Sequence, residues 1–353
     1  MLCGRDLEKT SEFFTQRLGF RVDTVFPADD PEVVVISGHG LRIRLVRGND
    51  ASPGFLRLIC DDPAGIAGGA TELTAPNGTR IELVPADPPL ALPPTVQSFV
   101  LTRSGDTAWG LGRAGMRYRD LIPDRQGGRF IASLIQIPEG GPVPDYVHFH
   151  RVRFQMIYCY KGWVQVAYQD QGPPLTMQPG DCVLQPPQIR HRVIECSPGL
   201  EVIEIGCPAA HETCADHELP LPTGELRPDR AFNGQRFVHH VASAAEWMPW
   251  RFDGFECRDI GIGVATEGLA GVRVARPVGS PSPQSKTHDG EFLFLFVLRG
   301  SVSLHCEGVE QLAAGDCFVV PAGAEHAFAG CSEDLELLEV ALPATSEGTG
   351  GPS

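Results

Sequence analysis

Three histidines and a glutamine near the middle of the chain have the spacing of a metal site. His148 and His150 lie one residue apart in the apolar stretch "YVHFHRVRFQMIYCYKG"; Gln155 follows in the same stretch, and His191 comes later. Alternate residues of a β-strand share a face, so His148 and His150 would converge. Three imidazoles on rigid strands suit iron, nickel, zinc, copper or manganese, and the Gln155 carbonyl would be a neutral fourth ligand. The alternative is a set of polar residues at a wet barrel mouth.

The elements that must position these residues occur twice in the chain. "YKGWVQVAY…PGDCVLQPPQIRHRV" is similar to "LRGSVSLHC…AGDCFVVPAGAEHAF". The matching positions are Gly162 and Gly300, Gly180-Asp181-Cys182 and Gly315-Asp316-Cys317, Pro186 and Pro321, and His191 and His326. The two glycines of the first match are 138 positions apart, and the two members of each other match are 135 positions apart. A repeat of this length indicates a duplicated domain, and its alternating apolar residues with turn signals predict an antiparallel sandwich or barrel.

Two Pro-rich stretches divide the chain into three segments. They are "PADPPLALPPTVQ" (Pro85–Gln97) and "PLPTGELRPDRAFNGQ" (Pro220–Gln235). We expect a first domain over 1–86, in which one helix, "DLEKTSEFFTQRLGF", is followed by a meander of strands. We expect two β-domains over 98–218 and 236–343, and a disordered tail over 344–353.

Composition excludes several classes of function. The 353 residues carry a net charge of −15, which argues against a nucleic-acid partner, because such binding depends on Lys and Arg. The 11 cysteines are odd in number and form no C-x-x-C pair, so we expect reduced thiols in a cytoplasmic protein. The strongest apolar run, "FLFLFVL" (Phe292–Leu298), is too short to cross a bilayer, and we expect no membrane partner.

The repeated segments resemble the cupin superfamily. Its first motif is H-x-H-x(3,4)-E-x(6)-G, matched here by His148, His150 and Gly162, and its second is P-G-x(5)-P-x-G-x-x-H, matched by Pro179, Gly180, Pro186 and His191. The resemblance covers residues 98–343 as two units, a bicupin. It implies a mainly β fold with two double-stranded β-helix (jelly-roll) barrels. Gln155 stands where the family has a glutamate, and Gln188 where the second motif has a glycine.

The loss of the glutamate bears on function. Without that carboxylate a metal complex would be more cationic, which favours an anionic small-molecule substrate, and one candidate general base is gone. A three-histidine centre is similar to that of several cupin dioxygenases. The resemblance therefore implies one divalent metal per chain, with Fe(II) favoured and Zn, Ni or Mn as alternatives, in a non-haem iron dioxygenase of a small oxygenated or aromatic compound. The alternatives are a zinc or nickel isomerase or cyclase, and a non-catalytic small-molecule-binding cupin.

The second cupin unit departs further from the motif. Aligned on Gly300, it places Lys286 and His288 at the histidine positions and Leu293 at the glutamate, while His326 is retained. Glu291 is the one acidic residue that could replace the missing ligand. We interpret this unit as a structural partner with a degenerate site, and the resemblance adds the expectation of a homodimer.

The first segment resembles half of a vicinal oxygen chelate protein of the glyoxalase superfamily, with a βαβββ arrangement. Glu82 matches the closing-strand glutamate of that family, but no histidine stands at the other ligand positions, so we expect packing or dimerisation rather than metal binding.

Two further clusters are weaker candidates. His211, Cys214 and His217 in "HETCADH" have a spacing that could hold zinc on a helix, but a surface loop is favoured. The arginines of "MRYRDLIPDRQGGRF" could orient an acidic substrate, although a solvated or ion-paired role is favoured for most of them: Arg117, Arg119, Arg125 and Arg129.

Overall fold

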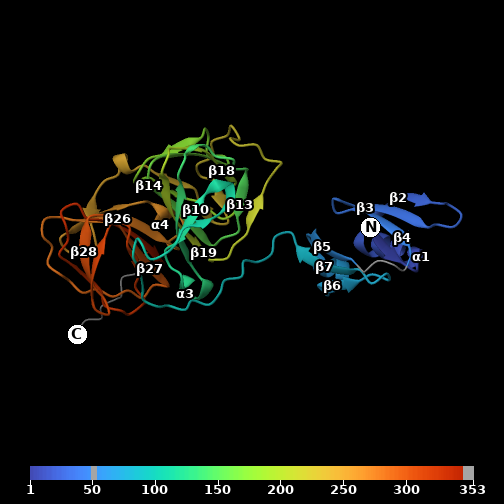
Figure 1. Cartoon of the computed structure of the whole chain (residues 1–353), viewed down its shortest axis with the longest axis horizontal. Helices are drawn as coiled ribbons and strands as arrows, with labels where there is room; N and C mark the ends of the chain where they lie inside the picture. The colour runs from blue at the N-terminus through green and yellow to red at the C-terminus, as the bar shows by residue number, and fades with distance from the viewer. Residues whose placement is uncertain (49–53, 345–353) are drawn as a thin grey trace. The chain divides into compact units, whose positions relative to one another are not determined.

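The computed structural model describes residues 1–48 and 54–344, and the chain forms two compact units, Met1–Pro89 and Leu90–Ser353 (Figure 1). Residues 345–353 of the predicted tail lie outside the described residues. No helix of the described part is long and apolar enough to cross a membrane.

The N-terminal unit contains two successive groups of strands, each with one α-helix. The first group is a four-stranded sheet of order β1-β4-β3-β2 with α1 and a π-helical turn: β1 (Leu2–Gly4), α1 (Leu7–Glu12), η1 (Phe13–Arg17), β2 (Arg21–Phe26), β3 (Val33–Gly38) and β4 (Leu41–Arg47). The second is a three-stranded sheet of order β5-β7-β6: β5 (Phe55–Cys60), α2 (Pro63–Ala67), β6 (Glu72–Thr74) and β7 (Arg80–Pro85).

This unit differs from the predicted single helix followed by a meander. A strand precedes α1 and pairs in parallel with β4, and β5 pairs in parallel with β7. The helix α2 was missed because it has only five residues, too few for a helical period; Asp62 caps it by accepting from the Gly65 N–H. Glu82 on β7 forms an ion pair with Arg57 at 3.1 Å. The resemblance to the glyoxalase superfamily stays a prediction.

The larger unit contains two barrels of two sheets each. The first barrel has one sheet of β9 (Gly110–Leu111), β10 (Arg117–Asp120), β11 (Ile131–Ile137), β14 (Phe154–Lys161), β17 (Cys182–Leu184) and β19 (Leu200–Cys207). Its other sheet has β12 (Gly141–Pro142), β13 (His148–His150), β15 (Val164–Tyr168), β16 (Leu175–Met177), β18 (His191–Cys196) and β20 (Thr213–Ala215). Short helical turns η2 (Arg113–Gly115) and α3 (Arg125–Gly128) connect its strands.

The second barrel repeats this plan. One sheet has β24 (Met248–Pro249), β25 (Phe255–Asp259), β26 (Gly271–Pro277), β27 (Phe292–Arg299), β30 (Cys317–Val319) and β32 (Glu336–Leu342), and the other has β28 (Ser301–His305), β29 (Val309–Ala313) and β31 (Ala327–Ala329). The matching glycines Gly162 and Gly300 both have positive φ, 72° and 69°, at the hairpin after β14 and β27. That backbone conformation explains why both copies have glycine there.

The barrels exchange one edge strand each: the strand that precedes a barrel in the sequence pairs with a sheet of the other barrel. The strand β8 (Val100–Thr102) precedes the first barrel but pairs with β30 of the second. Reciprocally, β23 (Val238–His240) precedes the second barrel but pairs with β17 of the first. The two strands occupy equivalent places in the repeat, 138 positions apart. The expected domain limits at 98 and 236 therefore fall just before strands that belong to the opposite barrel.

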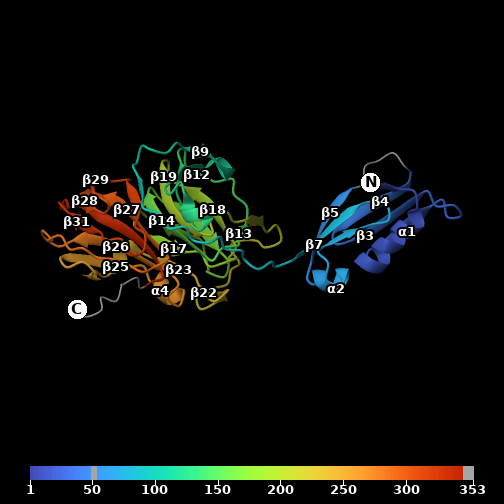
Figure 2. The same cartoon turned by 90° about the horizontal axis from the view of Figure 1, so that it is seen from below.

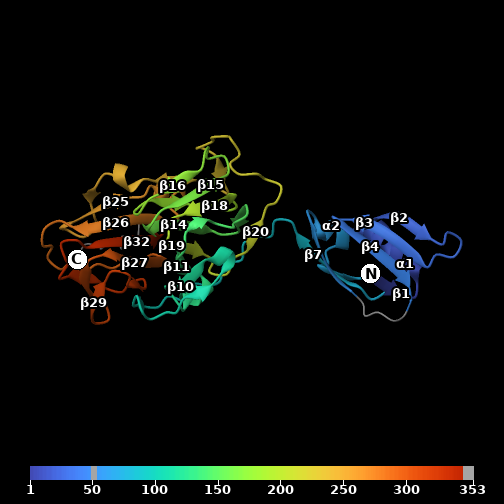
Figure 3. The ribbon, with the colours of Figure 1, turned by 45° about the horizontal axis from the view of Figure 1, so that its top comes forward.

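An apolar layer joins the barrels. Strands β14 and β19 of the first barrel lie against β26 and β27 of the second in all three views (Figures 1, 2 and 3). Outward-facing side chains of both sheets form one buried cluster, in which the rings of Phe130 and Phe292 stack at 4.1 Å. The side chains that alternate with these point into the two barrel interiors, where they form separate clusters.

A partly buried carboxylate at the edge of this layer joins the first barrel to the second. Glu291 accepts hydrogen bonds from Arg129 Nε at 2.6 Å, Arg153 Nη1 at 2.7 Å and Thr95 Oγ1 at 3.2 Å. Burial raises the pKa of Glu291, but the two arginines outweigh it, and the net pKa lies below its usual value of 4.5. This residue is thus not free to act as the metal ligand that the sequence suggested for the second unit.

We predict that Glu291→Gln lowers the free energy of unfolding by about 1–3 kcal/mol at about pH 7, because it weakens charge-assisted hydrogen bonds. A carboxyl with a lowered folded-state pKa contributes stability above its unfolded pKa and loses it as the pH falls through the folded value. The difference between wild type and variant should therefore shrink as the pH drops below 4.5. Denaturant titrations across this range test it, with Glu225→Gln, an exposed ion-pair partner of Arg227, as the control. A difference independent of pH would contradict the assignment.

Candidate metal centre

Two paired strands bring the three predicted histidines together. His148 and His150 lie at the ends of β13, and His191 opens β18, directly opposite His148 in the antiparallel register. One nitrogen from each ring lies within 4.8 Å of the other two, and all three residues are buried. The alternation of strand residues thus brings these imidazoles to one point, as the sequence predicts.

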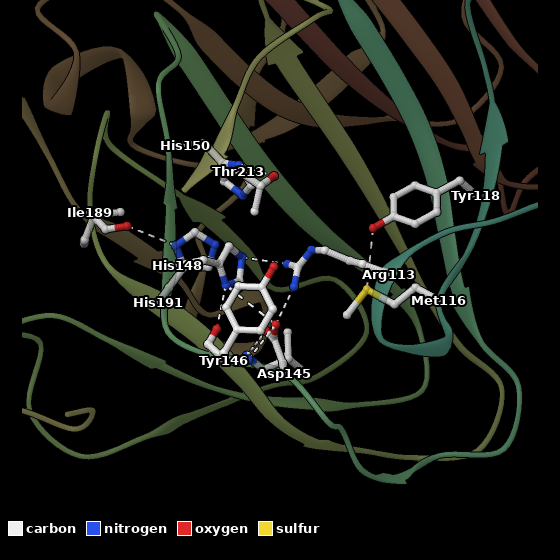
Figure 4. Close-up of polar contacts among 11 residues, drawn as sticks. Arg113, Met116, Tyr118, Asp145, Tyr146, His148, His150, Ile189, His191 and Thr213 are labelled. Atoms are coloured by element: carbon white, nitrogen blue, oxygen red, sulfur yellow. Dashed lines mark hydrogen bonds and ion pairs between the residues drawn. The ribbon is translucent and has the colours of Figure 1, made fainter. Parts of the chain in front are cut away.

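Hydrogen bonds orient two of the rings (Figure 4). His148 donates through Nδ1 to the carbonyl of Tyr146 at 2.8 Å, and His191 donates through Nδ1 to the carbonyl of Ile189 at 3.0 Å. Each donation fixes the tautomer and leaves the Nε2 lone pair for a ligand. His150 Nδ1 pairs with the hydroxyl of Thr213 at 3.2 Å. Histidines that bind a metal usually form such a hydrogen bond through the ring nitrogen that does not face the metal, so these three side chains fit a metal ion.

Burial keeps these imidazoles neutral. It lowers the pKa of His148 and of His191, and it lowers the pKa of His150 to about 3, with the neighbouring rings and Arg113 acting in the same direction. Neutral imidazole is the form that binds metals, since the protonated ring has no lone pair to offer. The site is therefore in its ligating form across the neutral range.

An arginine reaches the same point from the turn between β9 and β10 (Figure 4). Arg113 Nη2 donates to His148 Nε2 at 2.6 Å, and Arg113 also pairs with Asp145. Asp145 is fully buried and accepts from the backbone N–H groups of Tyr146 and Val193. A metal ion on His148 Nε2 requires the guanidinium to leave that nitrogen, while Asp145 keeps it nearby.

Gln155 lies on the interior face of β14, but its amide is directed elsewhere. Its Nε2 donates to Glu204 Oε1 on β19 at 2.6 Å. Glu204 faces the same interior, since it lies opposite Ile157 in the register of β14 and β19. The structure thus brings three of the four predicted ligands together, and the place of Gln155 as the fourth stays a prediction. It also supplies a carboxylate, Glu204, in the barrel that lacks the glutamate of the family motif.

The histidines line a cavity of about 400 Å³ inside the first barrel. Its walls are mostly aliphatic, with side chains such as Ile131, Ile135, Ile157, Val164, Val166 and Val202. The polar groups among its lining residues include Arg113, Glu204, Tyr118 and Gln185. Burial and nearby Glu204 raise the pKa of Tyr118 to about 12, although Arg113 acts in the opposite direction. A mostly apolar cavity with a few convergent polar groups is the usual form of a small-molecule site.

The segment "HETCADH" lies at the surface, as the sequence favoured, but its middle is a short strand rather than a loop. Residues Thr213–Ala215 form β20, which pairs with β13 beside the histidines. Thr213 and His211 line the cavity, and the His211 ring lies 5.3 Å from that of His150. Among the described residues, His211, Cys214 and His217 do not form a group that could hold a metal ion, so the weaker zinc alternative has no support. His211 instead belongs to the wall of the cavity.

The four predicted arginines mostly have the structural roles that the sequence favoured. Arg129 binds Glu291, Arg125 pairs with Asp120, Arg117 is exposed, and Arg119 is buried with a hydrogen bond to the carbonyl of Gly315.

The corresponding residues of the second barrel are engaged within the chain. His288 donates through Nε2 to the Val320 carbonyl at 2.8 Å and accepts at Nδ1 from the Gly290 N–H at 3.2 Å, so both ring nitrogens are used. Arg251 lies 3.3 Å from His326 Nε2 and pairs with buried Glu339. In this barrel an arginine–glutamate pair stands beside the histidine that the repeat retains.

Comparisons with known proteins agree with this architecture. Residues 272–341, in the second barrel, match the cupin domain family, whereas no curated protein matches the chain. Among solved structures, the chain is similar to protein Ylba from E. coli, at 12% identity and a TM-score of 0.53, over 71% of this chain and 93% of that one.

Two further structures show the same likeness. A putative glyoxylate-induced protein from Pseudomonas aeruginosa has 13% identity and a TM-score of 0.53, over 75% of this chain and 97% of that one. An oxalate decarboxylase from Lactobacillus farciminis, in a formate complex, has 14% identity and a TM-score of 0.52, over 72% and 90%. The predicted fold class is confirmed: the chain is mainly β, with cupin jelly-roll barrels.

The sequence interpretation missed Arg113 and Glu204. Both could have been found from the repeat: Arg113 stands 138 positions before Arg251, and Glu204 stands 135 positions before Glu339, the same two offsets that relate the motifs. Tyr118 and Thr213 carry no comparable signal, because only the three-dimensional structure brings them to the cavity.

We predict that alanine at His148, His150 or His191 lowers the affinity for a divalent ion by more than about 100-fold, because even the loss of a residue that only hydrogen-bonds to a ligand lowers metal affinity by about 10–100-fold. Gln155→Ala should cost less than about tenfold, because its amide binds Glu204. Zinc and manganese titrations of the purified variants measure this, with His240→Ala as a control histidine on the exchanged strand β23. A loss at Gln155 equal to that at the histidines would make Gln155 a ligand after all.

Proposed function

We propose that the first barrel is the active site of a metal-dependent enzyme, a non-haem iron dioxygenase that acts on a small oxygenated or aromatic compound. The observation that carries the proposal is the set of three neutral, oriented imidazoles at the wall of an apolar cavity of about 400 Å³. A bound divalent ion would act there as a Lewis acid toward a substrate oxygen, and iron would add dioxygen activation.

The residues of the chain would each have a defined part in this reaction. The three imidazoles hold the metal, and the aliphatic walls exclude water from the reacting groups. Arg113, at 2.6 Å from His148 Nε2, would bind an anionic oxygen of the substrate next to the metal. Asp145 positions Arg113, and it is held in turn by two backbone N–H groups. A metal held only by neutral imidazoles keeps its full positive charge, which also favours an anionic substrate.

A second candidate is a zinc or nickel isomerase or cyclase. The observation that favours it is Glu204, a carboxylate that lines the cavity and is oriented by the Gln155 amide at 2.6 Å. Such a group could accept a proton from a substrate, which an isomerisation needs and oxygen insertion does not. Manganese also belongs in the test, because the oxalate decarboxylase of Bacillus subtilis, 13% identical to this chain, has Mn(II) centres.

Elemental analysis of untagged, chelator-free protein tests the proposal first. We expect about one iron per chain, lost in His191→Ala, and oxygen uptake with catechol-like, diketone or keto-acid compounds. One zinc, nickel or manganese per chain without oxygen uptake would favour the isomerase, cyclase or lyase chemistry of the same site. No metal after reconstitution with each of these ions would refute a metal-dependent enzyme and leave a non-catalytic binding role.

A further inference from the structure

The two barrels contain the same arginine and the same glutamate at equivalent places. Arg113 follows β9 and Arg251 follows β24, and the strands that flank these arginines are also 138 positions apart. Glu204 lies opposite Ile157 of β14, and Glu339 lies opposite Leu295 of β27, at the same point of the sheet. The two copies can therefore be compared residue by residue.

In the second barrel the two residues form an ion pair. Arg251 donates to Glu339 through Nε at 3.1 Å and through Nη2 at 2.5 Å, and the carboxylate is only 2% exposed. Aromatic rings complete the packing: the Arg251 guanidinium lies 4.9 Å from the ring of Trp250 and 4.6 Å from that of Phe252. The interior of this barrel is occupied by its own side chains.

In the first barrel the same two residues are held apart. Arg113 pairs with Asp145, Glu204 accepts from Gln155, and no ion pair joins Arg113 to Glu204 in the described residues. The aromatic positions next to the arginine are small here: Gly112 replaces Trp250 and Ala114 replaces Phe252. Arg113 and Glu204 consequently both line the cavity of about 400 Å³.

We propose that the substrate lies between Arg113 and Glu204 and replaces the bridge that closes the second barrel. Such a molecule has a carboxylate for the Arg113 guanidinium and, at its other end, an ammonium or hydroxyl group that donates to Glu204. A guanidinium and a carboxylate at the wall of one apolar cavity favour a ligand of complementary polarity, because each end of the ligand then meets a group of opposite charge or a hydrogen-bond acceptor. This proposal rests on the metal site described above, which lies at the Arg113 end through the contact with His148.

Calorimetric titration with matched probes tests the proposal on the full-length chain, loaded with zinc and metal-free. The dipolar probes are glycine, β-alanine and γ-aminobutyrate, and the single-group probes are propionate and propylamine. We expect one dipolar probe to bind at least about tenfold more tightly than propionate or propylamine, because it alone satisfies both residues.

Variants then separate the two ends of the site. Arg113→Gln should weaken propionate and the best dipolar probe by about tenfold or more, and Arg113→Lys, which keeps the charge, should restore part of the loss. Glu204→Gln should weaken propylamine and the dipolar probe but leave propionate unchanged. Arg117→Gln and Glu195→Gln, which change exposed residues of β10 and β18, are the matched controls. Circular dichroism and zinc content verify that each variant is folded and loaded.

The proposal is overturned if propionate binds as tightly as every dipolar probe, if no probe binds at millimolar concentration, or if Glu204→Gln changes none of the affinities. A wrong metal assignment would give a different experimental result. A chain that takes up no metal would refute the enzyme proposed above, while the metal-free titrations would still decide whether Arg113 and Glu204 recognise a dipolar molecule.

Discussion

Side chains from the two seven-stranded sheets, each of which includes one exchanged strand, form one apolar layer between the barrels. This layer fixes which side chains of the facing strands point into the barrel interiors. Phe154, Met156 and Tyr158 of β14 point into this layer. Because strand side chains alternate, Gln155, Ile157 and Cys159 must point the other way, into the first barrel. A slip of one residue would exchange the two sets and place Gln155 in an apolar interface. The contact between the barrels therefore fixes the strand faces that build the cavity.

This dependence explains why a barrel with a polar interior can be stable. The first barrel has three imidazoles, an arginine, two carboxylates and a cavity beside the apolar side chains of its interior, and each of these lowers the gain from burial. The layer shared with the second barrel supplies apolar burial that the interior does not. The exchanged strands β8 and β23 and the Glu291 contacts join the same two bodies. The second barrel thus contributes apolar burial and polar contacts to the first, while its role as a structural partner without a metal stays a prediction.

The sequence predicted the three histidines because the information is local. A spacing of two on a strand fixes a common face for His148 and His150, and the repeated turn before His191 fixes where β18 begins. The direction of the Gln155 amide could not be predicted, because its partner Glu204 lies 49 positions away and the choice between a metal and a carboxylate depends on side-chain geometry. The short helix α2, the strand β20 and the strand exchange were missed for related reasons: each depends on pairing or capping partners rather than on periodicity.

The difference between the two barrels is itself evidence about function. The second barrel shows that this fold can close its interior with aromatic rings and an arginine–glutamate pair, and both ring nitrogens of its His288 are hydrogen-bonded within the chain. The first barrel has the same arginine and glutamate but small residues beside them, so an interior that could be filled stays open. Unfilled space and charged side chains at the wall of an apolar cavity both cost stability. In the described residues, the barrel that has this cavity is also the one whose three histidines lie together, which supports the proposal of a binding site for a polar small molecule there.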